Sequence, residues 1–152
     1  MKQWDKASFI AELTARRGEP EAEVARRILR WADQRKCRIW WGKGVRSGSF
    51  FPMVDHAGDQ YWTIAVWTSG TVEIQFQWMR RKLPFEIESK RQELRDKLNT
   101  VPGISIAGEG VDRRPNVPLQ VLTAPGALAQ FLEVLDWLVD EIRLQPRPEA
   151  PE

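Results

Sequence analysis

Residues 40–50, WWGKGVRSGSF, hold the residue types that contact phosphate groups. The glycines allow the backbone to approach an anion closely, and Lys43 and Arg46 supply positive charge, with Ser47 beside them. The segment is not a Walker A loop, because the pattern GxxxxGKS/T is absent and the chain continues into a predicted strand rather than a helix. The sequence therefore predicts either a loop that binds phosphate or nucleic acid, or a strand connection whose charges are solvated.

Aromatic residues and cations lie on both sides of this loop, the combination that binds single-stranded nucleic acid. Trp40, Trp41 and Tyr61 can stack on bases. The cations expected to contact the backbone are Arg38, Lys43, Arg46, Arg80 and Arg81. The alternative is burial, the commoner role of tryptophan. Because Trp40 and Trp41 are adjacent in a predicted strand, they point to opposite faces, so at most one belongs to the core.

Charge is unevenly distributed, although the whole chain has a net charge of only +2. Residues 26–46 carry a net charge of +7, and residues 131–152 carry −4. Such asymmetry favours an anionic partner. The alternative is a solvated helix face together with an acidic last helix.

The segment Glu73-Ile74-Gln75 is similar to the E-x-K strand of PD-(D/E)xK nucleases, whose acidic residues hold Mg²⁺. Gln75 stands where lysine is usual. Asp59 is expected about six residues along the strand from Glu73, or roughly 20 Å, which is too far for a shared metal ion. A metal-dependent nuclease is therefore an alternative rather than the leading hypothesis.

Cys37 and His56 are the only cysteine and histidine in the chain. A nucleophilic pair of these two would lack an acidic residue to orient the histidine and an oxyanion motif. Zinc sites need more cysteine and histidine than the chain has. We therefore expect no catalytic residue, no metal site and no cofactor.

A β-hairpin over residues 60–78 is the strongest structural pattern, and it must position the candidate residues. Its turn, Thr68-Ser69-Gly70, can place Gly70 at positive φ. A three-residue loop pairs Ala65 with Glu73, Thr63 with Gln75 and Tyr61 with Gln77. This makes one face polar, and the other then carries Trp62, Ile64, Val66, Val72, Ile74 and Phe76. Glu73, Gln75 and Gln77 are thus candidate contacts on the polar face.

Two more strands are predicted, over residues 38–41 and 49–54. Pairing of Asp55 with Gln60 would place Met53, Phe51 and Ser49 opposite Trp62, Ile64 and Val66. Residues 104–106 are a possible further short strand, within a mixed segment of which 113–118 is expected to be loop.

Helical patterns cover residues 8–17, 20–35 and 86–99, the last with a stripe of Ile87, Leu94 and Leu98. A final helix follows Thr123, a suitable N-cap. The sequence therefore predicts a single α+β domain over residues 1–143, with two layers: a four-stranded antiparallel sheet, and helices that cover one of its faces. Residues 144–152 are expected to form a disordered, Pro-rich tail.

Composition restricts the location of the protein. No apolar run approaches the roughly 20 residues needed to span a membrane, and the first residues lack the apolar stretch of a signal peptide. A lone cysteine is typical of a reducing compartment. These features predict a cytoplasmic protein with no membrane partner, and they leave the oligomeric state open.

The pattern WWGKG…GSFFP followed by EIQFQW resembles an uncharacterised bacterial domain, over about residues 20–143. That domain occurs alone or in larger proteins, some in restriction or defence-like settings, which implies work related to nucleic acid. The leading hypothesis is a non-catalytic module that binds nucleic acid or another phosphate-bearing ligand. A protein–protein interaction domain is the first alternative.

Overall fold

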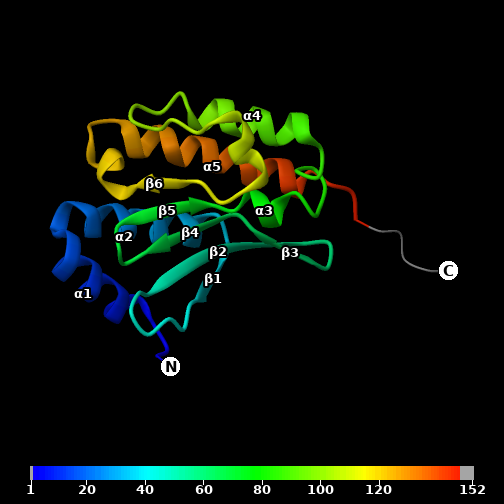
Figure 1. Ribbon diagram of the computed structural model, residues 1–152. Helices are drawn as coiled ribbons and strands as arrows, with labels where there is room; N and C mark the ends of the chain where they lie inside the picture. Colours follow the sequence, from blue (N-terminus) through cyan, green and yellow to red (C-terminus); the bar gives the residue numbers. More distant parts are fainter. Residues whose placement is uncertain (1, 148–152) are drawn as a thin grey trace.

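The computed structural model describes residues 2–147, which form an α+β fold with an antiparallel sheet (Figure 1). The helices are α1 (Lys6–Arg17), α2 (Glu19–Gln34), α3 (Phe76–Met79), α4 (Glu88–Leu98) and α5 (Ala127–Arg143), with 3₁₀ turns η1 (Gly108–Asp112) and η2 (Leu119–Thr123). The strands are β1 (Arg38–Trp41), β2 (Ser49–His56), β3 (Asp59–Trp62), β4 (Ile64–Trp67), β5 (Thr71–Ile74) and β6 (Asn116–Pro118). Most of the predicted tail, residues 148–152, lies outside the described residues.

The sheet has six strands rather than the predicted four. Its order is β1-β2-β4-β5-β6, and β3 pairs with β2 alone. The additional edge strand β6 pairs Val117 with Val72. Residues 113–118 were expected to be loop because of their prolines, but Pro118 lies in an edge strand, where a missing N–H is tolerated. Residues 104–106 form no strand.

The hairpin of β4 and β5 confirms the predicted register. Ala65 lies opposite Glu73, Ile64 lies opposite Ile74, and Gly70 has φ +94° in the turn. The hairpin is shorter than predicted, because β5 ends at Ile74 and α3 follows. The predicted pairing of Tyr61 with Gln77 is therefore wrong.

A change of register divides the long predicted strand into β3 and β4. In the β2–β3 pair, Met53 lies opposite Trp62, as predicted. In the β2–β4 pair, Phe50 lies opposite Val66. One extra residue therefore stands on the β3–β4 side, as in a β-bulge. Thr63 lies in this interruption, and its hydroxyl donates to the Pro52 carbonyl at 3.0 Å.

The bulge overturns two expectations about the sheet faces. Phe51 and Ser49 do not lie opposite Ile64 and Val66. Because side chains alternate along a strand, one extra residue also moves Trp62 to the face opposite that of Ile64. The prediction that Trp62 belongs to the apolar face is therefore wrong.

The main hydrophobic core joins the other face of the strands to the helices. Phe9 of α1 packs against Trp41 and Phe50, with ring centroids 6.0 and 4.9 Å apart. The stripes of α2 and α5 are buried in the same core. In Figure 1, α2 runs behind the strands, and α4 and α5 lie above them.

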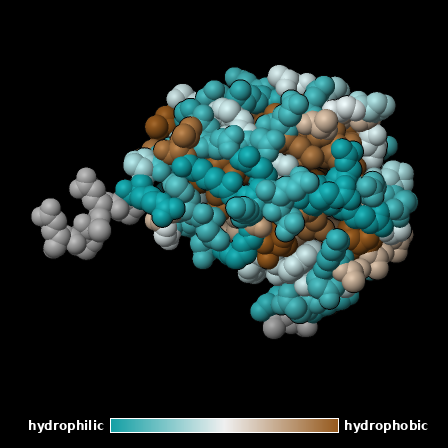
Figure 2. All heavy atoms as spheres, turned by 180° about the vertical axis from the view of Figure 1, so that it is seen from behind, coloured by the Kyte–Doolittle hydropathy of each residue, from teal (hydrophilic) through white to brown (hydrophobic). Residues whose placement is uncertain are grey.

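Some helix details differ from the sequence patterns. The N-cap of α5 is Gly126 rather than Thr123, which ends η2. Leu94 and Leu98 of α4 are buried as predicted, whereas Ile87 precedes the helix and is exposed. The side of the molecule shown in Figure 2 is mostly hydrophilic, with hydrophobic atoms visible between polar side chains. Among residues 2–147, the helices are too short or too polar to cross a bilayer.

Replacement of Ile74 by Ala should lower the free energy of unfolding by about 2–5 kcal/mol, because it removes a fully buried side chain. Ile87→Ala is the matched control, since Ile87 is 49% exposed, and it should change stability by no more than about 0.5 kcal/mol. Denaturant unfolding of the two variants measures both values. Equal midpoints would contradict the assignment of Ile74 to the core.

Candidate functional site

An aromatic cavity of about 380 Å³ lies on the face of the sheet that carries Glu73. Strands β1 to β5, α3 and the segment before β6 contribute its lining. The lining residues, hereafter the aromatic cavity, are Trp40, Phe51, Trp62, Trp67, Glu73, Gln75, Trp78 and Arg114. The cavity thus combines five aromatic side chains with a carboxylate, an amide and a guanidinium group.

Three of the aromatic rings form one packed cluster at the wall of the cavity. Trp40 lies opposite Phe51 in the β1–β2 pair, and their ring centroids are 5.4 Å apart. Trp62 joins them at 5.4 Å from Trp40 and 5.1 Å from Phe51, all in edge-to-face geometry. Such pairs stabilise each other beyond simple burial, by about 0.5–1.5 kcal/mol each. Trp62 reaches this cluster only because of the bulge.

Buried side chains support the same face. Met53 and Ala65 are 1% and 0% exposed, yet neither belongs to the main hydrophobic core. Met53 pairs with Trp62, and Ala65 pairs with Glu73. The aromatic face therefore has a small packed layer of its own.

The polar groups of the cavity are hydrogen-bonded to one another. The Trp67 indole N–H donates to Glu73 Oε1 at 2.7 Å, and the Gln75 amide donates to the same oxygen at 3.3 Å. Gln75 is 1% exposed, and its backbone N–H donates to the Thr63 carbonyl. Glu73 and Gln75 are therefore fixed side chains rather than solvated surface groups.

Cations lie beside the opening of the cavity. The Arg81 guanidinium lies over the Trp78 ring, 4.5 Å from its centroid. Arg114 is exposed and lines the cavity directly. Gln77 donates its backbone N–H to the Arg113 carbonyl at 2.9 Å, which joins α3 to the segment that carries Arg114.

Of the residues that the sequence singled out, the structure brings Trp40, Glu73 and Gln75 into this cavity. Trp41 packs against the core instead, so the expectation that the two adjacent tryptophans divide between the faces is confirmed. Tyr61 is 5% exposed, and its hydroxyl donates to the Leu83 carbonyl. Tyr61 therefore presents no ring for stacking.

Four other candidates do not line the cavity. Arg38 forms a two-bond ion pair with Asp55, with both contacts at 2.9 Å. This pair lowers the pKa of the Asp55 carboxyl and raises the pKa of Arg38. Arg80 lies 3.4 Å from Asp112. Gln77 is exposed on α3. Arg81 is connected to the cavity only by its contact with the Trp78 ring.

The glycine-containing loop between β1 and β2 is held by the N-terminal segment. Trp4 Nε1 donates to the Gly44 carbonyl at 2.7 Å. A Cβ atom at Gly48 would lie 2.5 Å from the Trp4 ring, so this position needs glycine. Arg16 contacts the Ser47 hydroxyl and the Arg46 carbonyl, while the Lys43 and Arg46 side chains are exposed. The loop begins two residues after Trp40.

The basic segment 26–46 is partly neutralised by residues distant in sequence. The pairs are Arg26 with Glu19 and Glu23, Arg35 with Asp136 and Asp140, and Arg38 with Asp55. The charge asymmetry read from the sequence therefore overstates the positive surface at this segment.

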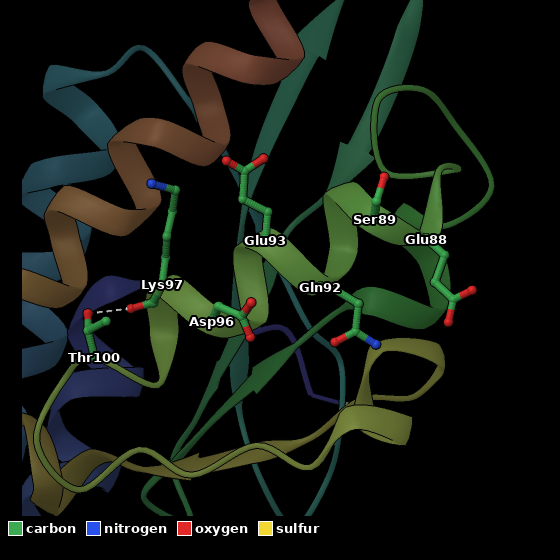
Figure 3. A pocket seen from close by; sticks show the side chains of 7 residues that line it. All are labelled: Glu88, Ser89, Gln92, Glu93, Asp96, Lys97 and Thr100. Carbon is green, nitrogen blue, oxygen red and sulfur yellow. Dashed lines mark hydrogen bonds between the residues drawn. The ribbon is translucent and has the colours of Figure 1, made fainter.

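Another surface depression lies along α4 and has a volume of about 620 Å³ (Figure 3). Figure 3 shows that all its labelled side chains come from α4, except Thr100, which follows the helix. It holds Glu88, Glu93 and Asp96 and none of the residues that the sequence singled out. Because one exposed helix supplies it, this depression is a solvated surface rather than a built site.

The catalytic alternatives find no supporting arrangement in residues 2–147. His56 Nε2 lies 2.7 Å from the Gln145 carbonyl, and Cys37 is 8% exposed. Asp55 is paired with Arg38, and Asp59 lies near Lys82 rather than near Glu73. Over the same residues, no three His, Cys, Asp or Glu side chains gather as the ligands of a metal ion would.

Sequence reasoning missed Phe51, Trp62, Trp67, Trp78 and Arg114. Pro52 was an available signal, because a proline inside a central strand indicates a bulge and hence a change of face. Trp78 reaches the cavity on α3 and Arg114 in the segment before β6, and the positions of both depend on contacts distant in sequence. Comparisons of the chain with protein-family models, with curated proteins and with solved structures yielded no match.

Native Cys37 should react slowly with a thiol reagent such as Ellman's reagent at pH 8. Burial raises the pKa of the Cys37 thiol, so less reactive thiolate is present at a given pH, and access is also restricted. The absorbance change in buffer, compared with that in denaturant, measures the difference. Equal rates in the two conditions would contradict this and restore Cys37 as a candidate nucleophile.

Proposed function

We propose that this protein binds single-stranded nucleic acid, with a base in the aromatic cavity and neighbouring phosphates on the cations around it. The observation that carries the proposal is the composition of the cavity: aromatic walls, hydrogen-bonding groups inside, and arginine at the opening. Aromatic rings bind the face of a base, and cations bind the backbone. This combination deepens the prediction of a nucleic-acid-binding module made from the sequence.

The size and lining of the cavity suit a nucleobase. A volume of about 380 Å³ lies within the usual range of sites for small planar groups. Trp40 and Trp78 are 39% and 40% exposed and line one cavity together, so both rings present surface that a ligand can cover. Base–aromatic stacking contributes about 1–3 kcal/mol per base.

The charges around the cavity favour a nucleic acid over a cationic ligand. Aromatic rings with a carboxylate could also hold an ammonium group. Arg114 and Arg81, however, would repel a cation at the opening and attract a phosphate. Lys43 and Arg46 lie in the loop that follows the strand of Trp40, so they can extend the path of the backbone.

This function also depends on a two-layer arrangement, which we propose as part of it. The helices would cover the core face of the sheet and leave the aromatic face free for a ligand. A cytoplasmic location and a role without catalysis, both expected from the sequence, agree with such a module. So does the resemblance to a bacterial domain found in defence-like settings.

Trp40→Ala and Trp78→Ala should each weaken binding of a fluorescein-labelled single-stranded oligonucleotide by about 1–3 kcal/mol, because each removes a stacking surface. Anisotropy titrations with DNA and RNA at low salt measure the affinity. Trp40→Phe is the conservative control and should retain most of it. If no oligonucleotide binds the wild-type protein at low salt, the proposal fails and a protein-interaction domain takes its place.

Arg114→Ala should lower the slope of log Kobs against log salt concentration by about 0.7, the value for one phosphate contact on a single strand. Lys43→Ala and Arg46→Ala should each lower the slope by the same amount if the loop between β1 and β2 contacts the nucleic-acid backbone. Arg30→Ala is the matched control, since Arg30 is an exposed cation on α2 and should leave the slope unchanged. A slope that responds to Arg30 but not to Arg114 would place the nucleic acid on the helices instead.

A further inference from the structure

We infer that the aromatic cavity selects guanine among the nucleobases. This inference rests on the nucleic-acid binding proposed above and names the base that the same site takes. It follows from two acceptor oxygens in the cavity, on Glu73 and Gln75, that have no protein donor among residues 2–147. Guanine is the base whose Watson–Crick edge offers neighbouring donors.

The inside of the cavity has two acceptors with free capacity. Glu73 Oε1 already accepts from Trp67 and Gln75, and within residues 2–147 no protein donor reaches Glu73 Oε2. Gln75 donates its amide to Glu73, so its own Oε1 is left as an acceptor. Gln75 lines the cavity, and no donor to its Oε1 is found within residues 2–147.

Two of the donors next to these acceptors are used within the protein, and the Arg114 guanidinium is a further donor in the lining. The Trp67 indole N–H and the Gln75 amide both donate to Glu73 Oε1. A ligand that brings a carbonyl or an unprotonated ring nitrogen to Glu73 Oε2 or Gln75 Oε1 would place an acceptor against an acceptor. A buried acceptor left without a donor is costly, so these two oxygens favour ligand N–H groups.

The bases differ in what their Watson–Crick edges offer. Guanine carries an N1–H and an N2 amino group side by side, which match the two acceptors, and its O6 carbonyl matches a donor such as the Arg114 guanidinium. Adenine and cytosine each have one amino group next to an unprotonated ring nitrogen, and uracil and thymine have one N–H between two carbonyls. The expected order of affinity is guanine first, then adenine and cytosine, then uracil and thymine.

The experiment compares labelled oligothymidylates that carry one central guanine, hypoxanthine, adenine or cytosine, with wild-type full-length protein at low salt. Hypoxanthine lacks only the N2 amino group of guanine. We expect the guanine oligonucleotide to bind about tenfold more tightly than the hypoxanthine one, the effect of a lost base-specific contact. This comparison needs no variant and so does not depend on how a substitution folds.

Glu73→Gln should bring the ratio of the affinities for the guanine and hypoxanthine oligonucleotides close to one. The glutamine keeps one oxygen for the Trp67 indole and places a donor where the second carboxylate oxygen was. Glu88→Gln is the matched control, since it makes the same charge change at an exposed position on α4 and should leave the ratio unchanged.

Three outcomes would overturn the inference. If all four oligonucleotides bind equally and Trp40→Ala weakens all of them, the inference of guanine selection is wrong, whereas the proposed nucleic-acid binding stands. No binding of any oligonucleotide would remove the proposed function itself. Quenching of tryptophan fluorescence by trimethyllysine, lost in Glu73→Gln, would show a cation site instead.

Discussion

The candidate site depends on the interruption of β-pairing opposite Pro52. Proline has no N–H to donate, so a central strand that contains it cannot keep a continuous ladder on both sides. β2 is such a strand, between β1 and the pair β3 and β4. The chain compensates with an extra residue at Thr63, whose hydroxyl donates to the Pro52 carbonyl and whose own carbonyl accepts from Gln75.

This single displaced residue decides which face Trp62 occupies. Without the bulge, Trp62 would share a face with Ile64 and compete for space in the main core. With it, Trp62 joins Trp40 and Phe51 on the opposite face, where three rings pack edge to face. The hydrogen bond from Gln75 to Thr63 also links the bulge to the polar groups of the cavity. The candidate site therefore depends on the β-bulge at Thr63.

Local pattern predicted those parts of the fold that local interactions fix. The β4–β5 hairpin followed from alternation and a glycine turn, and α2 followed from its apolar period. The division of Trp40 and Trp41 between the two faces followed from strand geometry alone. The bulge was missed because alternation was extended through Thr63 without regard to Pro52.

Interactions between distant residues account for what the sequence did not predict. Strand β6 forms because β5 offers it an edge, although its prolines suggest a loop. The residues Phe76–Met79 alternate like a strand but turn into α3, which brings Trp78 to the cavity. Arg35 forms ion pairs with Asp136 and Asp140 of α5. Part of the basic segment 26–46 therefore holds the fold together rather than forming a free positive surface.

A carboxylate among aromatic rings is costly unless its oxygens are satisfied. Here one oxygen of Glu73 accepts from Trp67 and Gln75, and the other has no protein donor within residues 2–147, so in this half-buried side chain it is left to water. A ligand that enters must replace that water with donors of its own, or lose more hydrogen bonding than stacking returns. The same arrangement that makes the Glu73 charge tolerable would therefore make the proposed site selective. In the proposed binding mode, affinity would come from the rings and the arginines, and discrimination from the acceptor oxygens that have no protein donor.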